Sequence, residues 1–532
     1  MKKLTLLLLS LLLIAGFAGC GQTGQDEGGV KRLNYNIGYD PDTFDPQACN
    51  NLENNVILTQ IYDTLLRENL NGVFEPSLAE SYTVSEDGLV YTFILKEGLK
   101  FADGSPLTTE DVIYSWARAL DPANAFEYAY QLYYIKNGES YNMGNASASD
   151  LGLKAVDART LEVTLENPAP YFASLTGFGT YGVISKAFAE AQATYGADLD
   201  STLASGPFMP AEWVKEQYLK VVKNPNYWDA ATVKIDELYI YAVSESATEI
   251  QMYETGQLDI TSRSMSTADQ KRLAEEGVLQ IRGNLSNRYI MVNNTHEAIN
   301  DVRVRKALCL ALDRESIAVN VVNNATAIGG FIPNKMAAVD DPSKLFRTED
   351  LIPANGDLEQ AKALLADAGY PEGKGFPVLE MLYTTNEANK ALAEALAEMW
   401  RTNLGIEVKA VNLEGAVRRE RKDSGDFDFS LDGWSTDYMD PYSFLELALS
   451  NNAYNEGQYS NPEYDALLKT AKSSNDQTVR QNAMAAAEKI LIEDMGVIPL
   501  YVSQGSYLQK DNVINVYYSL MGGTDFKWAE IK

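Results

Sequence analysis

The chain of 532 residues contains one histidine, His296, and this scarcity limits the chemistry that the protein can perform. Catalytic triads, zinc clusters and proton relays usually depend on imidazole groups. His296 lies in the polar stretch 293–296, which is typical of a loop. Because most catalytic classes lose their usual base, we expect no enzymatic activity and no bound cofactor.

Cysteine is almost as scarce, since the sequence contains only Cys20, Cys49 and Cys309. Three cysteines at wide spacing indicate neither a zinc site nor a full disulfide framework. Cys309 lies within an apolar run, 307–311, that is typical of a helix. We therefore interpret Cys309 as a small residue of the hydrophobic core.

Basic residues are also under-represented: the chain has 44 lysines and arginines but 74 acidic residues, and its formal net charge is -30. Such a field repels phosphate backbones, so we expect no nucleic-acid binding. The chain is 45% hydrophobic, which supplies a large interior. At about 150 residues per domain, its length predicts several lobes.

Only the N-terminus carries a long apolar run. Lys2 and Lys3 precede the run 4–15, and small residues follow up to Gly19, which is the pattern of a secretory signal. Cys20 comes next, and then a tether rich in glycine and glutamine. This arrangement resembles a bacterial lipoprotein signal, although Phe17 stands where leucine is usual. An ordinary cleaved signal with an incidental cysteine is the alternative.

The lipoprotein interpretation divides the N-terminus into two parts. Residues 1–19 would be the signal peptide, and residues 20–30 would be the lipidated Cys20 with its flexible tether. No other apolar stretch reaches the length needed to span a bilayer. We expect an extracytoplasmic body that is held to the cell membrane by a lipid.

Strand-like and helix-like patterns alternate along the rest of the chain. The run 89–95 predicts a strand, and Thr108 with Asp111 predicts the capped start of a helix. Three further helices are expected. The first begins at Asp301 and the second at Asp357, and the third covers 392–400 and ends near Gly405. A strand is expected to follow over 406–411. This alternation is typical of α/β lobes.

One stretch matches the first ligands of a calcium loop: Asp426, Asp428, Ser430 and Asp432. The sixth position, however, is Leu431, where such loops need glycine, and the twelfth is Asp437 rather than glutamate. We therefore interpret the stretch as a half-buried strand with one acidic face. Pairs of carboxylates that could catalyse glycoside hydrolysis are not a specific signal here, because a chain with 74 acidic residues contains such pairs by chance.

Nine segments in order resemble the solute-binding proteins that serve peptide and nickel ABC importers. They lie at 76–82, 87–88, 91–93, 100–108, 111–112, 205–208, 224–229, 300–308 and 433–438. The resemblance implies an α/β, two-lobed clamp of the periplasmic-binding-protein kind, with two interlobe connections. Lobe one would be 31–289 plus 498–532, with an inserted subdomain at about 72–198, and lobe two would be 290–497.

Within this family the oligopeptide binders look most similar, because of Gly433 to Tyr438. The resemblance implies that Asp437 receives the ammonium group of the peptide, while the backbone of Gly433, Trp434 and Ser435 pairs with the peptide as an added strand. A carboxylate suits an ammonium group in a closed cleft, since its desolvation is costly.

Two positions depart from the oligopeptide binders. Asn50 and Asn51 stand where some relatives place a substrate-facing acid, so one anchor would carry less charge. Leu431 stands where some carry an arginine for the peptide carboxylate. Arg421 or Lys422 could replace that arginine, or both could belong to a solvated charge run.

The sequence therefore predicts a monomeric, lipid-anchored receptor that captures oligopeptides and delivers them to an ABC transporter permease. Alternatives on the same fold are a receptor for a dipeptide, a small glycan or a nickel chelate, and a peptide-sensing surface lipoprotein. Direct nickel ligation is disfavoured, because only His296 offers an imidazole. A secreted hydrolase with paired acids is the alternative from another class.

Overall fold

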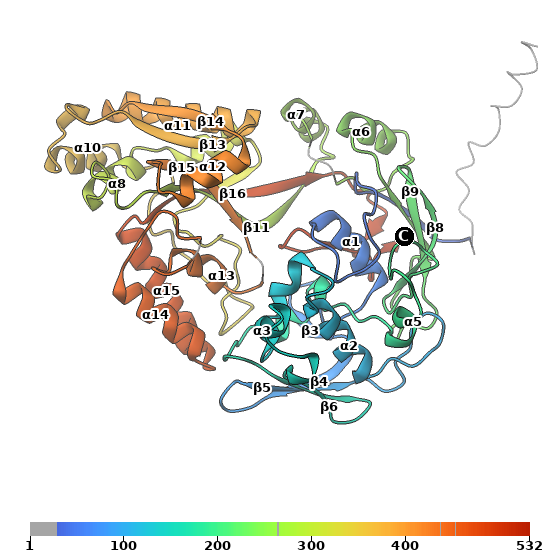
Figure 1. Ribbon diagram of the computed structural model, residues 1–532. Helices are drawn as coiled ribbons and strands as arrows, with labels where there is room; N and C mark the ends of the chain where they lie inside the picture. Colours follow the sequence, from blue (N-terminus) through green and yellow to red (C-terminus); the bar gives the residue numbers. More distant parts are fainter. Residues whose placement is uncertain (1–28, 263–264, 437, 453) are drawn as a thin grey trace, which may run out of the picture. The chain divides into compact units, whose positions relative to one another are not determined.

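The computed structural model describes residues 29–262, 265–436, 438–452 and 454–532 (Figure 1). The chain divides into Met1–Lys31 and one larger unit, Arg32–Lys532, to which all that follows refers. The predicted signal peptide, Cys20 and most of the tether fall outside the described residues, and so does Asp437.

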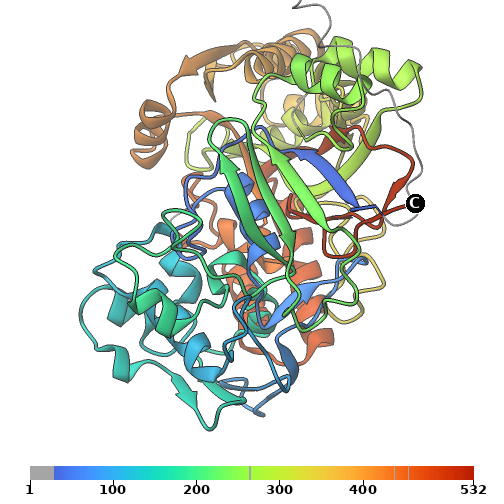
Figure 2. The same cartoon turned by 90° about the vertical axis from the view of Figure 1, so that its right-hand side faces the viewer.

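The first sheet of the larger unit has four strands in the order β1-β10-β9-β8. These strands are β1 Arg32–Asn36, β8 Phe208–Val214, β9 Tyr218–Lys223 and β10 Glu237–Tyr241. β1 pairs with β10 in parallel, whereas the other pairs are antiparallel. Figure 2 shows the blue strand β1 beside the green strands. The sheet thus joins the start of the described body to a segment about 200 residues later.

The second sheet is antiparallel and falls within the predicted insertion, 72–198. Its strands, in the order β4-β5-β7-β6, are β4 Ala79–Val84, β5 Val90–Leu95, β6 Leu153–Ala155 and β7 Thr160–Thr164. Helix α2 (Thr109–Leu120) begins as expected, because the Thr108 backbone N–H donates to Asp111 Oδ2 at 2.9 Å. Trp116 of this helix is fully buried and donates its indole N–H to the Tyr181 carbonyl.

The third sheet has six strands in the order β12-β16-β11-β15-β13-β14. They are β11 Gln280–Val292, β12 Ala325–Ala327, β13 Leu379–Thr384, β14 Val408–Leu413, β15 Phe429–Ser435 and β16 Val497–Tyr507. β13 pairs in parallel with β14 and β15, and the other pairs are antiparallel. The strand predicted over 406–411 is confirmed as β14, displaced by two residues.

The predicted helices of this region are confirmed. Asp301 and Asp357 are the N-caps of α8 (Val302–Leu310) and α10 (Leu358–Asp367), and each carboxylate accepts a backbone N–H of the first turn. α11 (Glu387–Leu404) is longer than the expected 392–400 and ends at Gly405, whose φ of 72° suits glycine. Cys309, in α8, is fully buried and unoxidised, as expected of a core residue.

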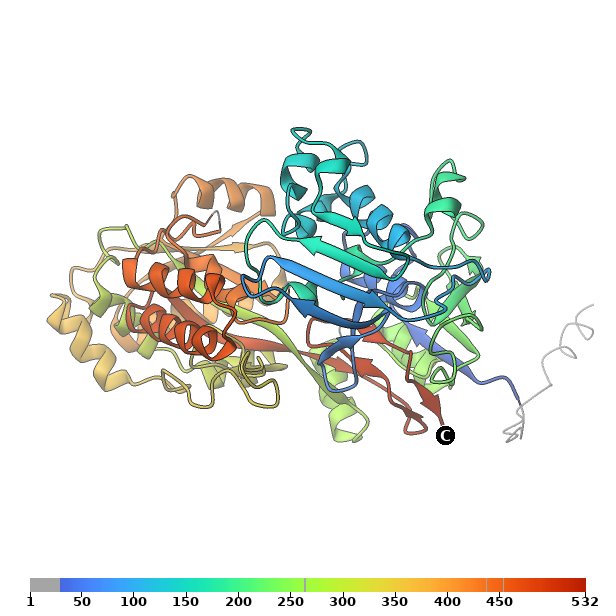
Figure 3. The ribbon, with the colours of Figure 1, turned by 90° about the horizontal axis from the view of Figure 1, so that it is seen from below.

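The other α-helices of four or more residues lie between the strands of these sheets in the sequence: α1 Leu52–Ile61, α3 Gly138–Asn142, α4 Phe172–Leu175, α5 Lys186–Glu190, α6 Ser246–Glu254, α7 Thr267–Glu275, α12 Gly415–Asp423, α13 Tyr442–Leu445, α14 Pro462–Ser473 and α15 Gln477–Glu493. Figure 3 shows α14 and α15 side by side in orange-red. Within the described residues, no helix is long and apolar enough to cross a membrane.

β11 and β16 are the two longest strands and pair along much of their length (Figure 1). Their register is interrupted between Gly283 and Asn287. The predicted lobe boundaries, 289/290 and 497/498, lie within β11 and at the start of β16. These boundaries stay a prediction.

β15 differs from the expected half-buried strand with an acidic face. It is a central strand, and Ser430 and Asp432 are as buried as the apolar residues that alternate with them. Helix α12 supplies the cations that cover this face, because Arg418 and Lys422 both bond Asp432 Oδ1, at 2.9 and 3.2 Å. Although burial alone would raise the pKa of Asp432, these two cations hold it below its ordinary value.

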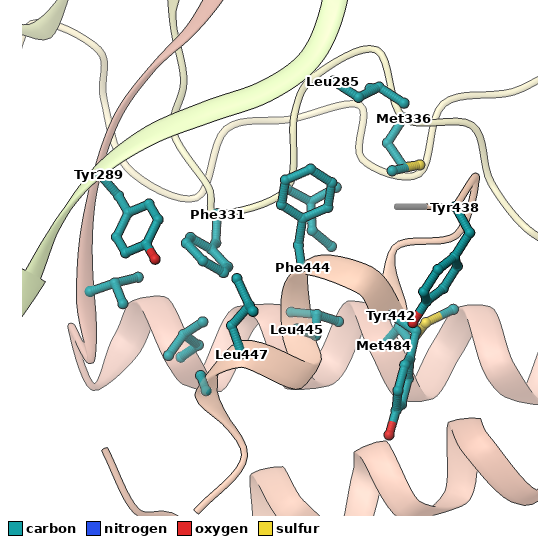
Figure 4. Close-up of a cluster of buried hydrophobic side chains, with 14 of the residues drawn as sticks. Leu285, Tyr289, Phe331, Met336, Tyr438, Tyr442, Phe444, Leu445, Leu447 and Met484 are labelled. Atoms are coloured by element: carbon teal, nitrogen blue, oxygen red, sulfur yellow. The ribbon is translucent and has the colours of Figure 1, made fainter. Parts of the chain in front are cut away.

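A cluster of buried aromatic and aliphatic side chains lies between β11 and the segment 438–447. Figure 4 shows Tyr289 of β11 next to Phe331, and Phe444 beyond it. The Tyr289 and Phe331 rings meet edge to face at 5.0 Å between centroids. Tyr438, at the far end of the cluster, stacks on Tyr171 at 4.4 Å. This packing holds the segment 438–447 in place.

A buried carboxylate, Asp63, holds the short hairpin of β2 (Leu66–Glu68) and β3 (Phe74–Pro76) in place, because it accepts from Arg67 Nη1 of β2 at 3.2 Å and from Ser77 Oγ, next to β3, at 2.8 Å. It accepts hydrogen bonds from Tyr227 Oη and Trp228 Nε1, both at 2.9 Å. Although burial alone raises its pKa, Arg67 and Lys527 hold the pKa of Asp63 below its ordinary value. The matched segment 224–229 therefore has a structural role, because two of its side chains bond the carboxylate that holds this hairpin.

Candidate functional site

A cavity of about 340 Å³ lies where several distant segments meet. The segments are the start of α1, the β2–β3 hairpin, the loop 177–180, the end of β15 and the C-terminal residues 517–525. The last segment contains the hairpin of β18 (Tyr517–Tyr518) and β19 (Thr524–Asp525), and the paired strands β17 (Val513–Ile514) and β20 (Glu530–Ile531) flank it in the sequence. Ligand pockets in proteins have about this volume or more.

Three of the predicted site residues line this cavity, namely Asn50, Asn51 and Ser435. Gly433 and Trp434 belong to the same strand as Ser435 but do not line it. Asp437 and Cys20 lie outside the described residues. The structure thus brings the N-terminal and C-terminal halves of the predicted site to one place.

The two asparagines already have partners. Asn51 is the N-cap of α1, and its Oδ1 accepts the backbone N–H of Asn54 at 2.8 Å. Its amide group also donates to Tyr39 Oη at 3.0 Å. Asn50 is exposed and donates to Glu127 Oε2 at 3.2 Å. Asn50 is therefore the more accessible of the two.

The end of β15 is held against β11 by unusually close contacts. A Cβ atom at Gly433 would lie 2.7 Å from the Asn287 carbonyl oxygen, so only glycine fits without a backbone shift. The Trp434 backbone N–H donates to Asn287 Oδ1 at 3.1 Å, and Ser435 Oγ bonds Ser286 Oγ at 3.0 Å.

The opposite edge of β15 is open over its last residues. β13 pairs only with Phe429 and Ser430. Among the described residues, no strand pairs with this edge from Leu431 to Ser435, and the Leu431 carbonyl accepts from Arg418. The backbone of Gly433 to Ser435 can therefore accept an added strand next to the cavity.

The polar floor of the cavity was not predicted from the sequence. It includes the adjacent pair Arg67 and Glu68 of β2, together with Tyr517, Ser519, Thr524 and Asp525. No motif marks these residues, since β2 has three residues and the others belong to two-residue strands and a turn. Burial raises the pKa of Glu68 to about 7.

The two cations suggested for a peptide carboxylate are engaged elsewhere. Lys422 is buried and pairs with Asp432 and Glu456. Arg421 pairs with Glu380 at 3.1 Å and Asp426 at 2.9 Å. Neither lines the cavity, and Lys422 does not belong to a solvated run as the alternative supposed.

Comparison with known proteins assigns the chain to a family. Residues 73–456 match the family described as bacterial extracellular solute-binding proteins, family 5 Middle. The chain belongs to this family, whose members are receptors for transport. The oligopeptide-binding protein OppA of Bacillus subtilis is 32% identical over all of both chains, and that of Salmonella typhimurium is 32% identical over 91% of this chain and 90% of its own.

Solved structures of the family share the fold. The unliganded open form of the murein tripeptide binding protein MppA has a TM-score of 0.84 at 28% identity, covering 94% of this chain and 97% of its own. Listeria monocytogenes OppA bound to peptide has a TM-score of 0.69 at 30% identity, covering 95% and 99%. The expected α/β, two-lobed fold is therefore confirmed.

Proposed function

We propose that this protein is a lipid-anchored receptor that captures oligopeptides and delivers them to an ABC transporter permease. The observation that carries the proposal is the open backbone edge of Gly433 to Ser435 beside the cavity that Asn50 and Asn51 also line. Main-chain pairing recognises what all peptides share. The oligopeptide-binding proteins among its relatives support the same ligand class.

In this proposal Asp437 receives the peptide ammonium group. It follows the open edge by two residues, so a peptide paired there would place its N-terminus nearby. A charge-assisted hydrogen bond would offset the desolvation of the ammonium group. Asn50 would supply a second, uncharged contact from the other side of the cavity.

Closure of the lobes would complete the site. β11 and β16 are the natural connections, and their register break between Gly283 and Asn287 is a suitable hinge. Similarity to MppA supports an open starting state, since the TM-score is 0.84 for its unliganded open form and 0.69 for another MppA structure.

A thermal-shift titration tests the ligand class. We expect tetra-alanine to raise the melting temperature, because a ligand that binds only the folded state stabilises it. Single amino acids, maltose and Ni²⁺ serve as controls and are expected to have no effect. Stabilisation by one of the controls but not by any peptide would overturn the proposal.

A dipeptide receptor is the second candidate. The dipeptide-binding protein DppE of Bacillus subtilis is 32% identical over 99% of both chains, as similar as the oligopeptide binders. Calorimetric titration with di-, tri-, tetra- and penta-alanine separates the two candidates. An affinity maximum at two residues would replace oligopeptides with dipeptides as the ligand.

A further inference from the structure

The floor of the cavity contains three buried oxygen atoms that lack a hydrogen-bond partner among the described residues: Glu68 Oε1, Tyr517 Oη and Thr524 Oγ1. Tyr517 is 7% exposed and Thr524 is 3% exposed. The Tyr517 hydroxyl interacts with the Glu68 carboxyl, and the Thr524 hydroxyl interacts with Tyr35, but neither contact has normal hydrogen-bond geometry. Unpaired buried polar groups are costly and uncommon in folded proteins.

Glu68 also lacks a counter-ion. Its Oε2 accepts from Ser519 Oγ at 2.7 Å, and no lysine or arginine forms an ion pair with it among the described residues. Its neighbour Arg67 is occupied, with bonds to Asp525, Asp63 and the Thr59 carbonyl. The cavity therefore has an uncompensated acidic group at its floor.

The remaining lining includes apolar surface. Leu52, Phe74, Phe178 and Met521 contribute aliphatic and aromatic groups to the cavity. Such a lining suits the methylene stem of a long side chain, while the acidic floor suits a positive group at its end. Lysine and arginine are the two side chains that combine these properties.

We infer that this cavity is a subsite for a lysine or arginine side chain of a bound peptide, with Glu68 as its counter-ion. The inference rests on the proposed function and adds a side-chain preference to it. The cationic group would donate hydrogen bonds to the Glu68 carboxylate and to the Tyr517 hydroxyl oxygen. The formal net charge of -30 favours the approach of such ligands.

The subsite is tested by comparing the affinities of matched peptides for the wild type and for a Glu68 variant. In tetra-alanine, each position is replaced in turn by lysine or by norleucine, which keeps the stem and removes the charge. Calorimetry gives the lysine-to-norleucine affinity ratio for the wild type and for Glu68→Gln. At one position we expect a wild-type ratio of about 30-fold, as for a half-buried charge pair, falling to about threefold or less in the variant.

Glu75→Gln is the matched control, because Glu75 is an exposed acid on the adjacent strand β3 and does not line the cavity. It changes the net charge equally, so we expect it to keep the wild-type ratio. A ratio that falls equally in both variants would assign the preference to long-range charge and overturn the subsite.

The outcomes separate this inference from the proposed function. Tetra-alanine that binds with no lysine preference at any position overturns the subsite alone. Failure of every peptide to bind overturns the proposed function, and the subsite with it. If the Glu68→Gln protein fails to fold, the wild type alone still tests the subsite, because a subsite predicts a lysine-to-norleucine preference at one peptide position. An equal preference at all four positions would assign it to long-range charge and overturn the subsite.

Discussion

Arg67 and Glu68 are neighbours on β2, yet the guanidinium group of Arg67 is not the counter-ion of Glu68. Arg67 Nε donates instead to Asp525 Oδ2 at 2.7 Å, and its Nη1 donates to Asp63 Oδ1 at 3.2 Å. Successive residues of a strand point to opposite sides, so the two charges have different partners. Asp63 and Asp525 balance Arg67, and Glu68 stays unpaired beside the cavity.

The affinity for a lysine peptide should depend on pH near neutrality. The pKa of Glu68 is raised to about 7 by burial, with Asp525 adding to the rise and the Ser519 and Tyr517 hydroxyls opposing it. A cationic side chain binds the ionised carboxylate, so affinity approaches its maximum as pH rises above 7 and falls as pH decreases through 7. Between pH 7.5 and 5.5 we expect the lysine-to-norleucine ratio to drop about tenfold.

Calorimetry at both pH values measures this drop, and the norleucine peptide cancels the titration of all other groups. Glu68→Gln should have a ratio that does not change with pH. A wild-type ratio that stays constant from pH 7.5 to 5.5 would show that Glu68 does not bind the lysine.

Asp437→Asn should weaken peptide binding by about 2 to 5 kcal/mol, the range for truncating one partner of a buried charge pair. N-acetylated tetra-alanine should bind the wild type poorly for the same reason. Asp423→Asn, at the exposed end of α12, is a suitable control. Equal affinity for free and acetylated peptides would remove Asp437 from this role.

Gly433→Ala should destabilise the folded protein and weaken peptide binding. The new Cβ would lie 2.7 Å from the Asn287 carbonyl oxygen, and relieving such a contact costs about 1 to 3 kcal/mol. Gly415→Ala is the matched control, because nothing lies within 4 Å of a Cβ there. Urea unfolding of both variants measures the difference, and equal stabilities would contradict the tight contact between β15 and β11.

Cys20→Ser should release the protein from the membrane without changing its affinity for tetra-alanine. The lipid would be attached at Cys20, and a single acylated residue is the only anchor that the sequence predicts. Cell fractionation with antibody detection measures the released share, and Cys49→Ser is the matched control. Retention of both variants at wild-type level would exclude lipid attachment at Cys20.

Much of the fold follows from local sequence. Thr108 with Asp111, Asp301, Asp357 and Gly405 mark helix ends, because capping needs only a few neighbouring residues. The acidic face of β15 was interpreted wrongly as partly exposed. The cations that bury Asp432 come from α12, and nothing in the alternation of β15 itself indicates that a helix covers this face.

The sequence by itself determined the family and the α/β class, and it predicted the candidate residues Asn50, Asn51, Gly433, Trp434, Ser435 and Asp437, because these inferences depend on motifs of neighbouring residues. Only the tertiary structure decided which of them share a cavity and which other side chains lie there. Glu68 and Tyr517 are separated by 449 positions, so their contact exists only after folding. Whether a carboxylate is paired or unpaired depends on which cations folding brings near it, and local sequence does not encode that.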